Sequence, residues 1–452
     1  MRADRTALAV PDPAVLAAAF RERRATVGVV GLGYVGLPLA LTAARAGFRV
    51  LGFDIDAGRV GRINRGESVI RQYPADVMAE ALGGGRFEAT ADFERLSEPD
   101  AILICVPTPL TRHREPDLSF VVNTANVIAS GLRKGQLVVL ESTTYPGTTQ
   151  DVVRPILERR GLLSGADFFL AFSPEREDPG NPHFGTSSIP KVVGGDGPDA
   201  LHVAQALYDA LVVKTVPVSS PATAEAVKLT ENIFRSVNIA LMNELKVVYD
   251  AMGIDVWEVI EAAKTKPFGF MPFYPGPGLG GHCVPIDPFY LTWKAREYDV
   301  ATRFIELAGE INTRMPHYVV ERLARAVDGR ARKPFAGSRI LILGIAYKKN
   351  VDDVRESPSL RLIELIEERG AACDYHDPFF PEIPPTRDHA ALAGRRSVPL
   401  DPPALCAYDA ILIATDHDEV DYRAVVAHAS LVVDTRNACE KAGIRDAKVV
   451  KA

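Results

Sequence analysis

The chain has 452 residues, with 52 Lys and Arg against 58 Asp and Glu and a formal net charge of -6. That length predicts several domains and excludes a single small module. The charge balance excludes the basic footprint of a nucleic-acid-binding protein. With 47% hydrophobic and 24% charged residues, the composition is that of a globular protein able to bury sizeable cores, and not that of a disordered chain.

The first residues and the cysteines indicate where the protein works. After Met1 the chain is charged, and its next apolar stretch is short and broken by Pro11 and Pro13, which is unlike a secretory signal. No apolar run approaches the roughly 18 residues that a membrane helix needs. The five cysteines are too widely spaced for a disulfide framework. We therefore expect a soluble, cytoplasmic protein with reduced thiols and with neither a membrane nor a nucleic-acid partner.

The first half of the chain predicts a doubly wound domain. A short leading helix is expected over residues 14–24. Apolar strands follow, separated by stretches long enough for helices, at residues 26–30, 49–54, 101–107, 137–142, 168–172 and 214–218. Continuous apolar strands in this rhythm favour a parallel sheet that helices cover on both faces.

The second half begins with a long helix, because apolar residues recur at helical spacing from Pro221 to about Asp250. The helical pattern continues to about residue 330, except for the Pro/Gly-rich stretch 272–288, which cannot be regular helix. Long irregular loops inside compact domains are typical of functional sites. Strands return at residues 339–344, 410–415 and 431–434, with a surface loop expected over 381–403.

These patterns predict an α/β fold in which a helical domain with a long central helix joins two Rossmann-like doubly wound domains. The expected divisions are a leading helix over 1–25, a first Rossmann-like domain over 26–219, a helical domain over 220–330 and a second Rossmann-like domain over 331–452. The apolar stripe of the central helix is too extensive for one small helical domain, which predicts a homodimer or a higher homo-oligomer.

The turn after the first strand predicts a dinucleotide site. It reads Gly31-Leu-Gly33-Tyr-Val-Gly36 and opens a helix, and the next strand ends at Asp54. The first glycine permits a tight turn, the second lets the backbone approach a pyrophosphate, and the third allows close helix packing. The acid accepts from ribose hydroxyls and repels a 2′-phosphate, so NAD is favoured over NADP.

Two further turns, at residues 106–109 and 142–147, follow strand ends, where parallel sheets place their ligands. They are either proline-stiffened turns with hydroxyl caps or turns whose hydroxyls lie near the nicotinamide. Besides the glycines and Asp54, the residues assigned to the cofactor are Tyr34, Val35, Arg59, Pro107, Thr108, Ser142 and Thr143.

The loop before Cys283 gives the sharpest chemical signal. Four glycines precede the thiol in Tyr274-Pro-Gly-Pro-Gly-Leu-Gly-Gly-His-Cys283, and Asp287 follows near the expected start of a helix. A cysteine is a strong nucleophile where its thiolate is favoured. A free cysteine is also often a small buried hydrophobe, but burial does not explain the glycines. No metal site is expected, because the adjacent His282 and Cys283 rarely point at one ion and no other Cys/His cluster has ligand spacing.

Several lysines and arginines lie at positions where a substrate could bind, on the central helix and after strand ends. Lys228 and Asn232 lie four residues apart, hence on one face of the central helix. A helical lysine is most often a solvated charge, and the alternative is an inward-facing pair that stabilises an oxyanion. Lys348, Arg355 and Arg436 follow strand ends in the last domain. They form either a cationic pocket for phosphates or ordinary charged surface loops.

In this order along nearly the whole chain, these motifs resemble the UDP-glucose/GDP-mannose dehydrogenase family. The resemblance rests on the three-glycine turn, residues 106–109 and 173–175, the Lys228 and Asn232 helix, the Cys283 loop with Asp287, and residues 348–358. It implies a four-electron oxidation of the C6 alcohol of a UDP-sugar to a uronic acid with NAD, for polysaccharide precursor synthesis. It also implies a dimer and a UDP-sugar site in the last domain.

The resemblance further implies roles for individual residues. Cys283 resembles the nucleophile that forms a thiohemiacetal and then a thioester. Lys228 and Asn232 resemble the oxyanion-stabilising pair. The remaining catalytic residues implied are Asp287 for a proton or water, Glu175 for thioester formation and hydrolysis, and Thr144 near the catalytic water. The substrate residues implied are Lys228, Tyr274, Gly278, Gly280, Gly281, Tyr347, Lys348, Arg355 and Arg436.

Two departures bear on the substrate. UDP-glucose dehydrogenases have Gly-Phe-Gly-Gly-Ser-Cys in the cysteine loop and a second glutamate where this chain has Pro179. Leu279 and His282 make the loop similar to that of the branch acting on N-acetylated sugars. This favours UDP-N-acetylglucosamine, with UDP-glucose and UDP-N-acetylmannosamine as alternatives.

Two other classes compete with this interpretation. A two-electron dehydrogenase of the β-hydroxyacid type shares the order of the fold but does not need Cys283. A non-catalytic protein that binds NAD or a nucleotide sugar has no use for a nucleophile combined with an oxyanion site.

Overall fold

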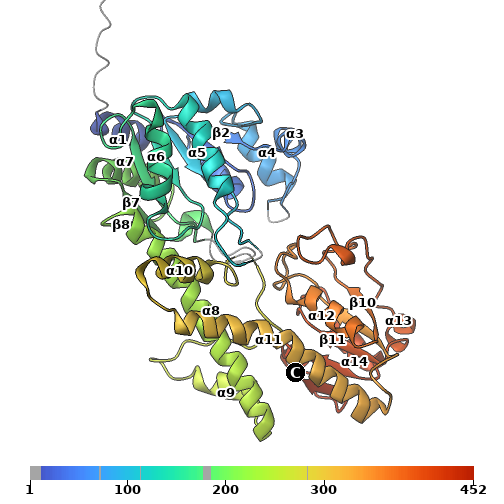
Figure 1. The fold of residues 1–452 in the computed structure, drawn as a ribbon. Helices are drawn as coiled ribbons and strands as arrows, with labels where there is room; N and C mark the ends of the chain where they lie inside the picture. Colours follow the sequence, from blue (N-terminus) through green and yellow to red (C-terminus); the bar gives the residue numbers. More distant parts are fainter. Residues whose placement is uncertain (1–11, 71–72, 112, 177–184, 282) are drawn as a thin grey trace, which may run out of the picture. The chain divides into compact units, whose positions relative to one another are not determined.

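The computed structural model describes residues 12–70, 73–111, 113–176, 185–281 and 283–452 (Figure 1). The chain divides into two compact units. The N-terminal unit comprises Met1–Glu231 and Trp293–Asp299, and the C-terminal unit comprises Asn232–Thr292 and Val300–Ala452. Each unit contains one Rossmann-like sheet, so the predicted α/β fold is confirmed. The finer division into four segments stays a prediction.

The sheet of the N-terminal unit has eight strands in the order β3-β2-β1-β4-β5-β6-β7-β8. The strands are β1 (Thr26–Val30), β2 (Arg49–Phe53), β3 (Phe87–Thr90), β4 (Ala101–Ile104), β5 (Leu137–Leu140), β6 (Phe169–Phe172), β7 (Lys191–Gly195) and β8 (Thr215–Val218). Because β1 lies between β2 and β4, the strand order reverses at β1, which is where such sheets bind ligands.

One feature of this sheet corrects the sequence prediction of a purely parallel arrangement. Strand β7 pairs antiparallel with β6, with Ala171 opposite Gly195, and β8 then follows β7 in parallel. Strands β3 and β7 are also absent from the predicted set. The reason for missing β7 is that it begins with Lys191 and ends with two glycines, so only Val192 and Val193 give it an apolar signal.

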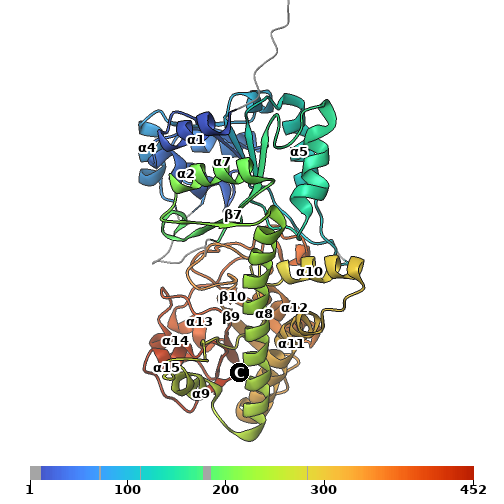
Figure 2. The same cartoon turned by 90° about the vertical axis from the view of Figure 1, so that its left-hand side faces the viewer.

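Helices cover both faces of the sheet, because successive side chains along each strand point to opposite faces and both sets are apolar. Val27 and Val29 of β1 belong to one apolar cluster and Val30 to the other. Figure 2 shows α1, α2 and α7 on one face and α5 on the other. The helical segments are α1 (Pro13–Arg21), α2 (Gly36–Arg45), α3 (Ala57–Asn64), α4 (Ala75–Gly83), η1 (Phe93–Ser97), α5 (Ser119–Gly131), η2 (Thr148–Val153), α6 (Arg154–Leu157), η3 (Glu158–Arg160), η4 (Thr186–Ser188) and α7 (Pro198–Asp209).

Helix α8 (Pro221–Met252) spans 32 residues, as the helical spacing predicts. The predicted break in the following helical region is also present, since no regular helix is found in the described part of 272–286. The other helices are α9 (Val256–Ala263), α10 (Asp287–Ala295), η5 (Arg296–Tyr298), α11 (Arg303–Ala326) and η6 (Val327–Ala331).

The sheet of the C-terminal unit is parallel, in the order β10-β9-β11-β12-β13. Apolar residues of α11 and α12 cover one face, and residues of α13, α14 and α15 cover the other. Its elements are β9 (Arg339–Leu343), α12 (Pro358–Glu368), β10 (Ala372–His376), η7 (Ala390–Leu392), α13 (Pro402–Cys406), β11 (Ala410–Ile413), α14 (Tyr422–His428), β12 (Val432–Asp434), α15 (Ala438–Lys441) and β13 (Val449–Lys451). The edge strands β10 and β13 are absent from the predicted set because neither is a continuous apolar run.

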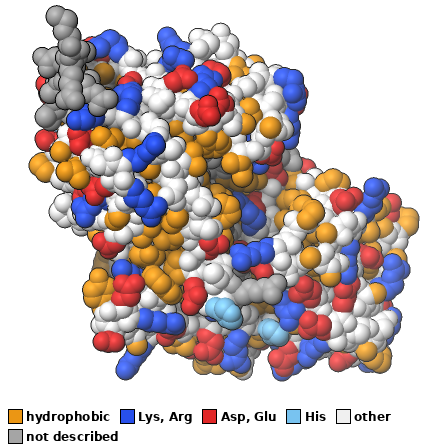
Figure 3. Space-filling view, turned by 45° about the horizontal axis from the view of Figure 1, so that its top comes forward, with side chains coloured by type: hydrophobic (Ala, Val, Ile, Leu, Met, Phe, Trp, Pro, Cys, Tyr) orange, Lys and Arg blue, Asp and Glu red, His pale blue; other side chains and the backbone are white. Residues whose placement is uncertain are grey.

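The surface agrees with the charge balance of the sequence. On the face in Figure 3, Lys and Arg side chains are interspersed with Asp and Glu. Across the described residues, no helix is both long and apolar enough to cross a membrane.

Helix α1 provides a test of the packing in the N-terminal unit. Phe20 is fully buried in the cluster that α1 shares with α7, whereas Val15 on the same helix is 66% exposed. We expect Phe20→Ala to cost about 3–5 kcal/mol by leaving a cavity, and Val15→Ala to change stability by no more than about 0.5 kcal/mol. Urea unfolding followed by fluorescence measures both, and equal midpoints for the two variants would contradict the packing.

Candidate active site

The glycine turn after β1 is shaped by close backbone contacts. Gly31 has a φ of +91°, and its N–H donates to the Phe53 carbonyl at 2.7 Å. A Cβ on Gly31 would lie 2.6 Å from the Cys105 carbonyl oxygen, and one on Gly36 would lie 1.8 Å from the Gly31 oxygen. Both glycines are therefore required by the packing of the turn itself.

Gly33 and Asp54 are the residues at this turn that fit a bound NAD. A Cβ on Gly33 would meet no protein atom within 4 Å, so the backbone here is open to a pyrophosphate. Asp54 follows β2, and its two oxygens accept from the backbone N–H groups of Leu32 and Asp56, each at 2.9 Å. The carboxylate is thereby fixed beside the glycine turn, where it can accept from a ribose.

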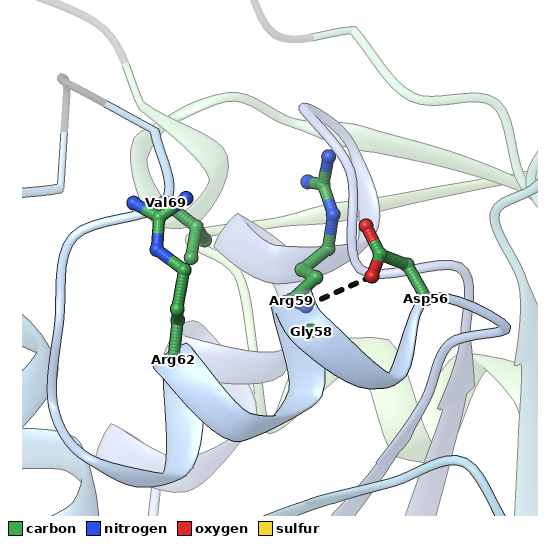
Figure 4. A pocket seen from close by; sticks show the side chains of 5 residues that line it. All are labelled: Asp56, Gly58, Arg59, Arg62 and Val69. Carbon is green, nitrogen blue, oxygen red and sulfur yellow. Dashed lines mark hydrogen bonds between the residues drawn. The ribbon is translucent and has the colours of Figure 1, made fainter.

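A cavity of about 270 Å³ opens beside this turn, at the start of α3 (Figure 4). The guanidinium of Arg59 donates to the Leu32 carbonyl at 3.2 Å, and the Arg59 backbone N–H donates to Asp56 at 3.1 Å. Arg59, predicted as a cofactor residue, thus lies at the same turn as Gly33. The lining residues are Asp56, Gly58, Arg59, Arg62 and Val69.

Polar groups also fix the turns that follow β4 and β5. The buried Ser142 hydroxyl donates to the Val106 carbonyl at 2.8 Å and lies 3.2 Å from the Ile104 carbonyl, so it links the ends of β4 and β5. Thr144 is 1% exposed, and within the described residues its hydroxyl has no hydrogen-bond partner. A buried hydroxyl in that position is a candidate for a bound water or ligand.

Glu225 holds the next part of the same turn. It is fully buried in α8, and it accepts from the N–H groups of Gly147 and Thr149, at 2.6 and 2.9 Å, and from the Thr149 hydroxyl at 2.7 Å. Burial raises the pKa of Glu225 above its ordinary value, although these hydrogen bonds oppose the shift. Glu225 is not among the site residues predicted from the sequence.

Lys228 is an inward-facing cation and not a solvated one. It is 8% exposed, and its ammonium donates to the backbone carbonyl of Glu175. The carboxylate of Glu175 is contacted at 3.3 Å by a second lysine, Lys191, which the sequence analysis does not identify. The N-terminal unit thus gathers two predicted catalytic residues around a single segment.

The remaining part of α8 brings Asn232 to Asp287. The Asn232 amide donates to the Asp287 carboxylate at 2.5 Å, and the two residues are 4% and 3% exposed. Asp287 is the first residue of α10, as predicted, and its N–H donates to the Cys283 carbonyl at 2.8 Å. The thiol-bearing residue is therefore one turn from a buried carboxylate and amide.

Cys283 differs in its exposure from the four other cysteines of the chain. Its side chain is half-buried, whereas Cys105, Cys373 and Cys439 are buried and Cys406 is exposed. Burial raises the pKa of Cys105 and Cys373 well above the ordinary value, and that of Cys439 to about 12. The thiolate is disfavoured at those three sites, so they are poor nucleophiles.

The glycines before Cys283 pack against the last domain. The Gly281 N–H donates to the Arg355 carbonyl at 3.1 Å. A Cβ on Gly280 would lie 2.5 Å from Cβ of Tyr347, and one on Gly278 would lie 2.9 Å from Pro358. These glycines let the cysteine loop approach the segment after β9, so two predicted substrate segments meet within the C-terminal unit.

Gly276 connects the same loop to Arg436 and to a buried pair of amides. Its N–H donates to Asn243 at 3.0 Å, and a Cβ on it would lie 2.7 Å from the Arg436 guanidinium. Asn243 in turn donates to Asn312 at 2.8 Å. Asn243 and Asn312 are not among the predicted site residues, although an amide on the buried face of a predicted helix is a signal that could have found them.

The other predicted substrate residues described by the structure are more exposed than the glycines of the loop or have other partners. Tyr274 is 40% exposed, stacks on Trp257 with ring centroids 5.7 Å apart, and donates to Glu261 at 2.9 Å. The Arg355 guanidinium is paired with Asp353 at 2.6 Å, and Lys348 is half-buried. His282 and Pro179, which bear on substrate choice, lie outside the described residues.

Comparison with known proteins decides the family. The NAD-binding domain of the UDP-glucose/GDP-mannose dehydrogenase family matches residues 25–212, its central domain residues 222–314 and its UDP-binding domain residues 341–441. The chain belongs to this family. The N-terminal unit therefore contains an NAD-binding domain, and the chain is a member of a family of NAD-dependent UDP-sugar dehydrogenases.

Individual members of the family are similar to this chain over most of their length. A UDP-N-acetyl-D-glucosamine 6-dehydrogenase of Pseudomonas aeruginosa is 36% identical over 395 residues, which cover 87% of this chain and 90% of that protein. A UDP-N-acetyl-D-mannosamine dehydrogenase of Pyrococcus horikoshii is 36% identical with the same coverage. A solved UDP-D-ManNAc dehydrogenase structure from Pyrococcus horikoshii has a TM-score of 0.84, with 32% identity, and covers 94% of this chain and 98% of that one.

The described residues include no group of three or more His, Cys, Asp or Glu that could hold a metal ion.

Gly33 allows the cofactor site to be tested apart from the fold. A Cβ at Gly33 has room in the protein, so we expect Gly33→Ala to leave the melting temperature unchanged and to weaken NAD binding roughly tenfold or more by obstructing the pyrophosphate. Gly36→Ala is the contrasting variant, because its Cβ collides with the Gly31 backbone and should lower the melting temperature. Calorimetric titration with NAD and thermal melting separate the two effects. Unaltered NAD affinity in Gly33→Ala would contradict the assignment.

Proposed function

We propose that this protein oxidises the C6 alcohol of an N-acetylated UDP-hexosamine, UDP-N-acetylglucosamine in the first place, to the uronic acid, for polysaccharide precursor synthesis. The observation on which this rests is the packing of the glycine-rich loop before Cys283 against Tyr347, Arg355 and Arg436. That packing gives the half-buried thiol a fixed place in the same unit as the family's UDP-binding domain.

Covalent capture by Cys283 accounts for two oxidations of one substrate. The thiol adds to the C6 aldehyde to give a thiohemiacetal, and its oxidation gives a thioester. Water then adds to the thioester carbonyl, the C–S bond breaks, and the uronic acid leaves with Cys283 restored as a thiol. NAD supplies the hydride acceptor for both oxidations.

The other residues of the proposal stabilise charge on the substrate, transfer protons or bind the diphosphate. Lys228 and Asn232 stabilise the oxyanion that develops at C6. Asp287, held by Asn232, takes up a proton or orients water, while Glu175 and Thr144 serve the attacking water in thioester hydrolysis. Lys348, Arg355 and Arg436 contact the diphosphate, for which guanidinium groups are well suited.

UDP-N-acetylmannosamine is a second candidate substrate, because a relative that acts on it is as similar to this chain as the one that acts on UDP-N-acetylglucosamine. The two sugars differ only in the direction of the substituent at one carbon.

The substrate and the number of electrons are tested together by following NADH with a panel of UDP-sugars. We expect the highest kcat/KM with UDP-N-acetylglucosamine and about two NADH per sugar consumed, because the aldehyde is retained on Cys283. A ratio near one would indicate a two-electron dehydrogenase. Cys283→Ser should retain NAD affinity and lose acid formation, and Cys406→Ser is its control. Full turnover by Cys283→Ser would rule out the covalent role.

We also propose that the protein is a homodimer through α8. Phe234, Leu241 and Val248 recur every seven residues on this helix and are 47%, 45% and 45% exposed. Three large apolar side chains along one helical stripe are typical of an interface.

Leu241→Arg should therefore convert the dimer to a monomer, since it places a charge in the middle of the apolar stripe. Val213→Arg, at a residue that is 68% exposed elsewhere in the chain, is the control and should remain dimeric. Light scattering coupled to gel filtration measures the mass. A monomeric parent protein, or a dimeric Leu241→Arg variant, would contradict the assignment.

A further inference from the structure

A buried ionic cluster lies where strands β5, β6 and β7 meet. Glu141, Lys191 and Tyr208 are 1%, 4% and 0% exposed. The Lys191 ammonium donates to one oxygen of Glu141 at 2.6 Å, and the Tyr208 hydroxyl donates to the other. Both carboxylate oxygens of Glu141 thus have a donor, and the position of Lys191 is fixed from behind.

The antiparallel strand places this lysine at the candidate site. In the pairing of β6 and β7, Ala171 lies opposite Gly195 and Phe172 opposite Gly194. Continuing this register three residues beyond Phe172 places Glu175 opposite Lys191. The side-chain contacts agree, since the ammonium reaches the Glu175 carboxylate and the Pro174 carbonyl, each at 3.3 Å.

These contacts use the full hydrogen-bonding capacity of the ammonium. A lysine has three N–H donors, and those of Lys191 face Glu141, Pro174 and Glu175. Burial by itself lowers the pKa of Lys191, but the two carboxylates outweigh it and raise the pKa above its ordinary value. Burial and the neighbouring Glu141 raise the pKa of Tyr208, so its hydroxyl keeps the proton that it donates.

Glu175 is therefore held by two lysines that act on different atoms. Lys228 binds its backbone carbonyl, and Lys191 binds its carboxylate. The next residue is fixed as well, because Arg176 pairs with Glu231 at 2.6 Å and donates to the Pro190 carbonyl at 2.6 Å. A buried ion pair adds little net stability compared with apolar residues of the same volume, so stability alone does not account for a lysine and a glutamate in this core.

We propose that Lys191, anchored by Glu141 and Tyr208, is a positioning residue that orients the Glu175 carboxylate for thioester hydrolysis. This rests on the proposed function, in which Glu175 serves the attacking water. In that step Glu175 accepts a proton from water as the water oxygen bonds to the thioester carbon, and the C–S bond then breaks with the electron pair leaving on sulfur. Lys191 transfers no proton and acts only through the orientation and charge of Glu175.

The test separates hydrolysis from the earlier oxidations. Lys191→Met alone leaves Glu141 buried without its ion-pair partner, so the double variant Lys191→Met/Glu141→Gln removes both charges together. We expect it to give a normal first burst of NADH, a steady-state rate reduced roughly 10- to 100-fold, and accumulation of a sugar adduct on Cys283 by intact-protein mass spectrometry. Lys191→Arg, which keeps the positive charge, should have a steady-state rate much closer to that of the parent than the double variant has. Lys214→Met, at an exposed lysine just before β8, is the control and should match the parent.

The outcomes distinguish the role from a structural one. Parent-like turnover in the double variant overturns the proposal, and so does a loss of the NADH burst without any adduct. Where the double variant does not fold, Tyr208→Phe replaces it, because this change removes one donor from Glu141 with little change in volume. Tyr208→Phe should also accumulate the adduct, and its absence overturns the proposal. Failure of the parent to form NADH with every UDP-sugar overturns the proposed function instead, and this role with it.

Discussion

Carboxylate acceptors that follow the carboxyl ends of strands hold the neighbouring loops of this protein. Backbone N–H groups in a loop that leaves a buried strand must find acceptors, because an unpaired buried group is costly. Asp54 after β2 accepts two of them beside the glycine turn. Asp377 after β10 accepts from Ile345 and Ala346, at 2.7 and 3.1 Å. The same device occurs in both units, and in each it fixes the loop that follows the first strand.

The second constraint is close approach of backbones, which explains the glycines in two different ways. Gly31 and Gly36 are required because the turn folds on itself. Gly280 and Gly281 are required because Tyr347 lies against them. The glycines before Cys283, which burial of the thiol does not explain, therefore serve the packing of the cysteine loop on the segment after β9. Gly33 has no such contact, which is why it is the glycine that best indicates a ligand.

Several charged side chains of the N-terminal unit lie around Glu175. Lys228 of α8 and Lys191 of β7 both contact Glu175, and Glu141 at the end of β5 contacts Lys191 from behind. Lys191 has an acceptor for each of its three N–H donors, and both carboxylate oxygens of Glu141 have a donor, as buried charges in a medium of low dielectric require. The antiparallel reversal between β6 and β7 makes this convergence possible, since it puts the first residue of β7 beside the segment after β6.

The sequence by itself determined the α/β class, the long helix α8, the glycine turn with Asp54 and the start of a helix at Asp287. Each of these is a local pattern, because periodicity, glycine spacing and strand-terminal acids are written in neighbouring residues. Only the tertiary structure decided the direction of β7, the burial of Lys228 and the partners of Glu175. Those depend on contacts between Lys191, Glu141 and segments far away along the chain, and a charged residue gives no sign in sequence of whether it faces water or a buried partner.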